Sequence, residues 1–180
     1  MTKIKQKGFT LVELLITASI FSIVMVIITG IFVYAIRTQM FLFTSKKIIA
    51  ETSYAMEYMS RALRVAKKDH LGNCIGTNYN YEVTYGGQGI KFINPLQGDK
   101  CQEFYLDPTT HTIKFNNGSE VIQLTSDGIK IANLHFEVFG DSPGDPLQPF
   151  VRILIEAQTR QGGSPLRLQT SISQRDPDIQ

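Results

Sequence analysis

The hydrophobic pattern is dominated by a run of 23 residues, Leu14 to Ile36, that contains no charged side chain. At a helical rise of about 1.5 Å per residue the run is about 35 Å long, which exceeds the ~30 Å hydrocarbon core of a bilayer. Apolar residues occupy every face of this helix, whereas a surface helix of a soluble domain keeps one polar face. The pattern therefore predicts a membrane-spanning helix.

Beyond this run the apolar positions narrow to one helical stripe. Its members recur at alternating steps of four and three residues: Ile48, Thr52, Ala55, Met59, Ala62 and Ala66. No proline occurs before Pro95, so nothing interrupts a helix that begins at Phe9. We expect this helix to end near Asp69, because Gly72 and Asn73 form a stop signal.

After Gly72 the pattern changes to short β-like runs divided by turn residues. The predicted strands are Tyr81–Tyr85, Gly89–Ile93, Glu103–Leu106, Thr112–Phe115, Glu120–Leu124, Ile129–Phe139, Phe150–Ala157 and Leu166–Ser173. Asn116, Asn117 and Gly118 are predicted to form a hairpin turn with successive positive φ angles. The fold class is therefore α+β, with a long N-terminal transmembrane and stalk helix packed on an antiparallel β-sheet head.

The charge distribution gives an orientation to the membrane helix. Lys3, Lys5 and Lys7 precede Gly8 without an acidic residue, and cytoplasmic flanks are enriched in such residues. This predicts a cytoplasmic N-terminus and a head outside, although Arg37 and two later lysines reduce the contrast. Residues 9–180 contain 15 basic and 16 acidic side chains. Because this part of the chain is nearly neutral, its net charge does not support binding to the phosphate backbone of a nucleic acid.

A conventional secretory signal does not explain the apolar run. Such signals have an apolar stretch of about 7–15 residues and a small-residue cleavage site of the A-x-A type. The run here is longer, and residues 33–37 match that site poorly. We therefore expect the apolar segment to be retained.

Glu13 is the one charged residue between Phe9 and Ile36. A carboxylate at the centre of a membrane helix costs about 2.5–3.5 kcal/mol, and intramembrane acids are by default functional and paired. The alternative is a glutamate in the headgroup region without a partner.

The segment Lys7–Leu15, KGFTLVELL, lies between a short basic leader and the apolar run. It resembles the class III signal of type IV prepilins and type II secretion pseudopilins. The resemblance implies that a membrane peptidase cuts after Gly8, that Phe9 is then N-methylated, and that Glu13 is needed for assembly. It divides the chain into a removed leader (1–8), a transmembrane and filament-core helix (9–44) and an extracytoplasmic pilin head (45–180). The head comprises the helix end (45–69) and a β-rich part (75–175).

Physical chemistry supplies a reason for this arrangement. Cleavage removes the lysines and creates an α-amine at Phe9, whose ordinary pKa is about 7.7–8.0. In a bundle of apolar helices that cation needs a counter-ion, which Glu13 of a neighbouring subunit would provide. Such a buried ion pair fixes the relative positions of the two neighbouring helices more than it adds stability.

Cys74 and Cys101 are the only cysteines. An even count outside the cytoplasm is compatible with one disulfide, which would close a loop of about 28 residues and stabilise by roughly 3 kcal/mol. The alternative is two unrelated thiols. His70 and Cys74 have a metal-like spacing, but no second pair accompanies them.

No nucleophile elbow or phosphate loop is present, so we expect no enzymatic activity and no cofactor. Asp141 and Asp145 are weak calcium candidates, and a solvated turn is the simpler interpretation. Arg61, Arg64 and Lys68 are predicted to share a helical face. They would suit a DNA-binding tip or, more simply, a cation-rich helix C-terminus.

The leading hypothesis is a minor pilin or pseudopilin, because of the Gly8-Phe9 junction, Glu13 and the continuous helix. The segment Leu124–Phe136, the strand Phe150–Ala157 and the ending Leu168–Arg175 resemble large minor pilins and J-type pseudopilins, which implies a role in starting filament assembly. The implied partners are the prepilin peptidase/N-methyltransferase, other pilin or pseudopilin subunits, the inner-membrane assembly platform and the lipid bilayer. The implied location is the inner membrane, then the filament. The alternatives are a non-polymerising single-pass membrane protein with a ligand-binding head and a DNA-binding tip pilin of a competence apparatus.

Overall fold

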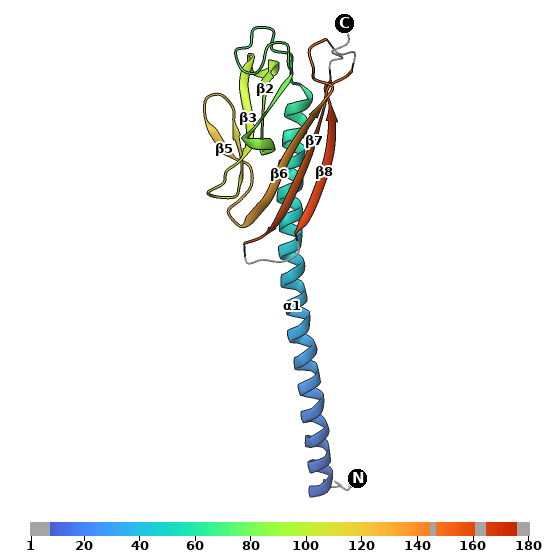
Figure 1. Cartoon of the computed structure of the whole chain (residues 1–180). Helices are drawn as coiled ribbons and strands as arrows, with labels where there is room; N and C mark the ends of the chain where they lie inside the picture. The colour runs from blue at the N-terminus through green and yellow to red at the C-terminus, as the bar shows by residue number, and fades with distance from the viewer. Residues whose placement is uncertain (1–7, 145–146, 161–164, 176–180) are drawn as a thin grey trace, which may run out of the picture. The chain divides into compact units, whose positions relative to one another are not determined.

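The computed structural model describes residues 8–144, 147–160 and 165–175 (Figure 1). One long helix, α1, extends over Leu11–Arg64 and is followed by antiparallel strands, which is the α+β layout that the sequence predicts. The chain forms two compact units, Met1–Thr44 and Ser45–Gln180, and α1 contributes residues to both. The second unit is called the head below.

The head contains two antiparallel sheets (Figure 1). The five-stranded sheet has the order β1-β2-β3-β4-β5, with the strands Tyr81–Thr84, Gly89–Asn94, Lys100–Leu106, Ile113–Asn116 and Val121–Gln123. The 3₁₀ turns η1 (Tyr85–Gly87) and η2 (Pro95–Gln97) lie between its first three strands. The three-stranded sheet has the order β6-β7-β8, with the strands Ile129–Phe139, Phe150–Thr159 and Leu166–Ser173.

Alternating burial explains why these segments are strands. In β7 the buried residues are Val151, Ile153, Ile155 and Ala157, at every second position. All eight predicted strands form, with ends shifted by a few residues; β3 begins at Lys100 rather than Glu103. The sequence predicted a single antiparallel sheet, whereas the structure has two sheets, because the division depends on which strands pair with each other.

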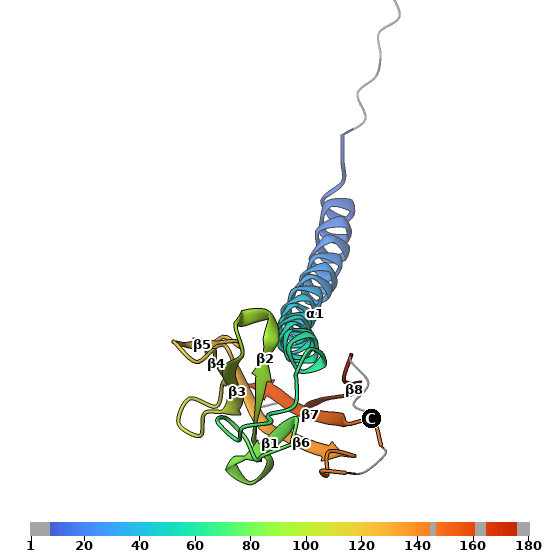
Figure 2. The same cartoon turned by 90° about the horizontal axis from the view of Figure 1, so that it is seen from above.

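One core joins the two sheets to the second part of α1. Figure 2 shows β2 and β3 on one side of the helix end and β6, β7 and β8 on the other. The cluster contains Ala55, Met59 and Leu63 from the helix, each 0% exposed, together with buried residues of both sheets. Phe104 stacks on Phe92 and on Phe115, with ring centroids 5.6 and 4.6 Å apart. The apolar helical stripe therefore packs where its spacing predicts.

The predicted end of the helix is wrong by five residues, because α1 ends at Arg64 and not at Asp69. Two of its last carbonyl groups accept hydrogen bonds from distant residues: Leu63 from the Tyr81 hydroxyl and Arg64 from the Arg175 N–H, both at 2.8 Å. The Lys67 N–H then bonds to the Ile93 carbonyl, so the chain already follows β2. These partners replace the terminal cap that a glycine usually provides.

The predicted geometry of the β4–β5 turn is also incorrect in part. The hairpin forms, but Gly118 alone among its turn residues has a positive φ, of 84°. Asn117 contributes instead through its side chain, whose oxygen accepts hydrogen bonds from the N–H groups of Ser119 and Glu120 at 2.9 Å. An asparagine side chain that bonds to the following backbone is an alternative to the left-handed conformation.

Candidate functional site

The N-terminus of α1 is built by Thr10. The Thr10 hydroxyl accepts a hydrogen bond from the Glu13 N–H at 3.3 Å, and its carbonyl accepts one from the Leu14 N–H at 3.2 Å. Thr10 is therefore the N-cap, and Glu13 occupies the third helical position, where a negative charge complements the helix dipole. The helix consequently begins at Leu11, two residues later than predicted, and leaves Phe9 outside it.

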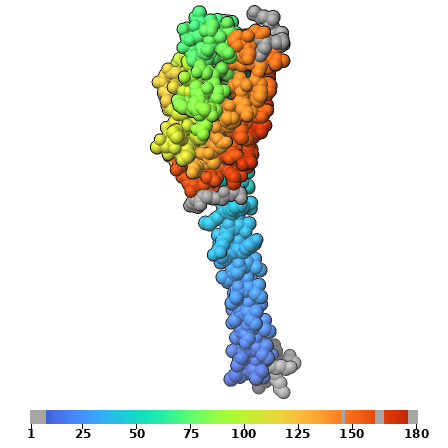
Figure 3. All heavy atoms as spheres, in the orientation of Figure 1, coloured from blue at the N-terminus to red at the C-terminus, as the bar shows by residue number. Residues whose placement is uncertain are grey.

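The described part of the first unit exposes its side chains. Every residue from Gly8 to Thr44 is exposed. Figure 3 shows one face of this part of the helix. The helix is long and apolar enough to cross a membrane, with a mean hydropathy of 2.6 in its most apolar window and none of that window buried. An uncovered helix that is apolar on every face is suited to lipid or to other apolar helices.

Four serine and threonine hydroxyl groups inside this segment are satisfied by the helix itself. Thr17, Ser19, Ser22 and Thr29 each donate to a backbone carbonyl four residues earlier, at distances of 2.8 to 3.0 Å. Back-bonding of this kind is the usual way to place a hydroxyl group at membrane depth. These polar residues therefore need no partner from another molecule.

Glu13 differs from these hydroxyl groups. Its backbone takes part in the helix and its cap, but its carboxylate has no hydrogen bond or ion pair with any described residue. It is exposed and is the one charged residue between Phe9 and Ile36. A carboxylate in such a place needs a partner that this part of the chain does not supply.

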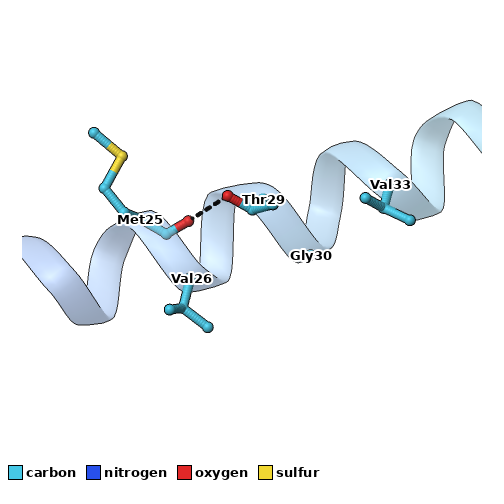
Figure 4. Close-up of a pocket in the computed structure, with 5 residues that line it drawn as sticks. All are labelled: Met25, Val26, Thr29, Gly30 and Val33. Carbon is cyan, nitrogen blue, oxygen red and sulfur yellow. Dashed lines mark hydrogen bonds between the residues drawn. The ribbon is translucent and has the colours of Figure 1, made fainter.

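A shallow apolar depression lies on the surface of the same helix around Gly30 (Figure 4). Its lining residues are Met25, Val26, Thr29, Gly30 and Val33. A Cβ atom added to Gly30 would have no neighbour within 4 Å, so the space is open to other molecules. α1 continues through this position without a break.

Cys74 and Cys101 are joined by a disulfide with a Cα–Cα distance of 5.5 Å, which links the segment after α1 to the start of β3. Asp69, only 3% exposed, organises the same segment. Its carboxylate accepts hydrogen bonds from the N–H groups of Leu71, Gly72, Cys74 and Ile75, at 2.8 to 3.2 Å. The sequence analysis missed this role, although an aspartate three residues before a glycine is a turn signal.

The calcium candidates have a different structural setting. The Asp141 carboxylate accepts hydrogen bonds from the N–H groups of Asn80 and Tyr81, both at 2.9 Å, and from the Asn80 side-chain amide at 2.7 Å. Donors therefore surround both of the oxygen atoms that a cation would use. Asp145 lies outside the described residues. Within the described ranges no three His, Cys, Asp or Glu side chains are placed to hold a metal ion.

The two remaining sequence candidates are also changed by the structure. Cys74 is in the disulfide and His70 contacts the Asn78 side chain at 3.3 Å, so these two residues do not form a shared metal pair. Lys68 lies beyond the end of α1, and the predicted helical face with Arg61 and Arg64 is therefore not formed. Arg61 pairs with the preceding Glu57 at 2.7 Å.

The comparisons with known proteins concern the N-terminal segment. The family model described as the prokaryotic N-terminal methylation motif matches residues 3–29. No curated protein and no solved structure matches the chain significantly. The motif implies processing by a prepilin peptidase, assembly with other pilins and, with the long apolar helix, anchoring in the inner membrane. Pilin-like proteins have a structural role and are generally not enzymes.

The matched residues cover the whole candidate site, from the basic leader through Gly8, Phe9 and Glu13 to Thr29, and stop one residue before Gly30. The apolar helix and the antiparallel head that follow have the layout of the same class. The chain therefore carries the class III prepilin signal of the type IV pilin-like proteins.

Proposed function

We propose that the chain is a minor pilin or pseudopilin, a structural and initiating subunit without catalysis of its own. A prepilin peptidase would cut after Gly8 and methylate the new N-terminal Phe9. The processed chain would wait in the inner membrane, with its N-terminus at the cytoplasmic side and its head outside. It would then enter a type IV pilus or a type II secretion-type pseudopilus through residues 9–44.

The observation that carries this proposal is the contrast between Glu13 and the hydroxyl groups near it. Four hydroxyl groups of the apolar segment bond to their own helix, whereas the Glu13 carboxylate has no partner in the described chain. Cleavage after Gly8 would create a cation at Phe9 in every subunit. The Phe9 amine of one subunit and Glu13 of another would then relieve each other's desolvation.

The isosteric variant Glu13→Gln tests this proposal. It removes the charge but keeps the Thr10 cap, because that cap uses the Glu13 backbone N–H. We expect cleavage after Gly8 and methylation as in the wild type, and at least a tenfold loss of incorporation into filaments. The loss follows because an amide cannot act as counter-ion to the Phe9 amine. The measurements are intact mass of the membrane protein, with and without the peptidase, and the amount in sheared filaments.

The matched control is Glu57→Gln, which removes a carboxylate from the same helix within the head. Glu57 pairs with Arg61 on an exposed surface, so this variant should be incorporated like the wild type. Normal incorporation of Glu13→Gln would refute the counter-ion role. A wild-type chain that keeps its lysines in the presence of the peptidase would refute the pilin proposal and favour a non-polymerising membrane protein.

A further inference from the structure

We propose that the base of the head binds the phosphate groups of anionic phospholipids through Lys46, Lys47 and Arg160. The base is the end of the head at which α1 enters it, and it includes the β5–β6 loop, residues 124–128. The inference goes beyond the proposed function, because it requires only that α1 anchors the chain in a bilayer. It would also hold for a membrane protein that never enters a filament.

The spacing along α1 brings the first two of these cations to the surface of a bilayer. A second apolar group, Met40–Phe43, follows the uncharged run. The helix from Leu14 to Phe43 is about 45 Å long, which matches the ~40–45 Å thickness of a bilayer with its headgroups. Lys46 and Lys47 follow three and four residues after Phe43, and both are exposed. Their long side chains can therefore reach the phosphates of the adjacent leaflet.

The β5–β6 loop is fixed against this part of the helix. Glu51 of α1 accepts hydrogen bonds from the Ser126 N–H at 2.9 Å and from the Ser126 hydroxyl at 2.8 Å. Lys47 extends over the same loop, since a Cβ atom added to Gly128 would lie 2.7 Å from its Nζ atom. The loop therefore belongs to the same end of the head as Lys46 and Lys47.

Arg160 reaches this loop from the end of β7. Its Nε atom donates to the Asp127 carbonyl, and its Nη2 atom donates to the Thr110 carbonyl at 2.9 Å. Asp127 and Gly128 are consecutive, so Arg160 and Lys47 contact neighbouring residues of the loop. Figure 1 shows the start of β6 and the end of β7 at the end of the head where α1 enters it. Cations from two distant parts of the chain are therefore gathered at the base.

The charge of the base is only partly neutralised. Lys47 pairs with Glu51 at 3.7 Å, and its side chain remains 57% exposed. Within the described ranges Lys46 has no ion pair, and Arg160 bonds to uncharged carbonyl oxygens. The Asp127 carboxylate accepts from the side-chain amide of Gln123 at 3.0 Å, which is also uncharged. Three cations thus share the base with two carboxylates, and the cations keep exposed surface for an external anion.

The arrangement of the cations favours a lipid surface over a single small anion. Lys46 and Lys47 are adjacent on a helix and point about 100° apart, so their ammonium groups do not converge on one point. A leaflet presents many phosphates in one plane, and each cation can meet a different one. Near an anionic surface each Lys or Arg strengthens binding by about fivefold. The inference also gives a role to the lysines after the apolar run, which the orientation of the membrane helix leaves unexplained.

The test is lipid retention by the full chain. The protein is reconstituted in nanodiscs with equal amounts of phosphatidylglycerol and phosphatidylcholine, then washed in a neutral detergent, and the retained lipids are extracted and quantified by mass spectrometry. We expect phosphatidylglycerol to be enriched about tenfold at low salt. The enrichment should be lost at about 1 M NaCl, where the Debye length is about 3 Å.

A double variant measures the contribution of the base. Lys46→Gln with Lys47→Gln should lower the enrichment at least about threefold, because even one of these lysines is worth about fivefold. The matched control is Arg61→Gln with Lys91→Gln. Arg61 has an i,i+4 partner, Glu57, as Lys47 has Glu51, and Lys91 has no ion pair with any described residue. This control removes the same charge elsewhere on the head and should leave the enrichment unchanged.

Arg160 is tested by charge rescue, because it also holds the loop. Arg160→Gln should lower the enrichment, and Arg160→Lys should restore it, since lysine keeps the charge without the two-pronged contact to the carbonyl groups. Equal losses in the two variants would mean that Arg160 acts through the shape of the loop, which would remove it from the lipid contact.

The remaining outcomes would overturn the inference. An enrichment in Lys46→Gln with Lys47→Gln equal to that of the wild type would mean that the base does not contact lipid. An equal loss in the control pair would mean that net charge matters rather than the base. Displacement of the lipid by inorganic phosphate, beyond the effect of NaCl at the same ionic strength, would indicate a small-anion site. No arm of the test requires cleavage after Gly8 or filament assembly, so its failure and the failure of the proposed function are distinguishable.

Discussion

Replacing Asp69 with asparagine should destabilise the head while preserving the size of the side chain. The buried Asp69 carboxylate accepts four backbone hydrogen bonds, two at each oxygen. An asparagine amide has only one oxygen, and its nitrogen cannot accept a hydrogen bond. The Asp69→Asn variant therefore leaves two N–H groups of this segment without an acceptor.

The magnitude follows from the cost of unsatisfied groups. A buried donor that loses its partner costs about 1–3 kcal/mol, so two such donors give a loss of about 3 kcal/mol, allowing for partial relaxation. Burial by itself would raise the pKa of Asp69, but the four N–H donors outweigh it and lower the pKa from 3.8 to about 2. That difference corresponds to roughly 2 kcal/mol of stabilisation of the charged form over the protonated form.

The pKa shift gives this loss a pH dependence. The pKa of Asp69 is lower in the folded protein than in the unfolded chain, so its contribution to stability is complete above about pH 4. The contribution decreases as the pH falls from about 4 to about 2, because the folded state must then accept a proton. The difference in unfolding free energy between the wild type and Asp69→Asn should therefore be largest at neutral pH and should shrink at pH 2.

The assay is urea unfolding of the full chain in a non-ionic detergent, with the disulfide intact. The chain has no tryptophan, and six of its seven tyrosines lie in the head, so near-ultraviolet circular dichroism of the tyrosines reports mainly the packing of the head. Asp99→Asn is the matched control, because Asp99 is 56% exposed and pairs with Lys67 at the surface. A loss below about 0.5 kcal/mol for Asp69→Asn at pH 7, which is close to the measurement error, would refute the reasoning. A loss that is the same at pH 7 and pH 2 would refute its electrostatic part.

Two further predictions use the same titration. Tyr81→Phe removes the hydroxyl group that donates to the Leu63 carbonyl at 2.8 Å, and should cost about 1–2 kcal/mol, whereas Tyr79→Phe at an exposed site should cost little. An unchanged urea midpoint for Tyr81→Phe would contradict the proposed capping of α1. The double variant Cys74→Ser with Cys101→Ser should lose roughly 3 kcal/mol. Wild-type protein treated with a reductant should show the same loss, and a difference between the two would point to an effect of the serines.

The candidate site could be predicted from the sequence because its chemistry is local. Gly8, Phe9 and Glu13 lie within six consecutive residues, and the uncharged run that follows is read directly from residue types. The family motif supports the same segment. Gly30 is different, since a lone glycine in an apolar helix is compatible with bending or with close packing. The structure adds a shallow depression beside it.

The sequence by itself determined which segments are helix and strand, because the periods of 3.6 and 2 residues repeat within each segment. Only the tertiary structure decided that α1 ends at Arg64, because Tyr81 and Arg175 supply its terminal donors from distant parts of the chain. The same holds for Asp141, whose hydrogen-bond partners lie about 60 residues earlier, and for the division of the strands into two sheets. A local pattern records what each residue prefers, whereas these features depend on which distant groups the folded chain brings within hydrogen-bonding distance.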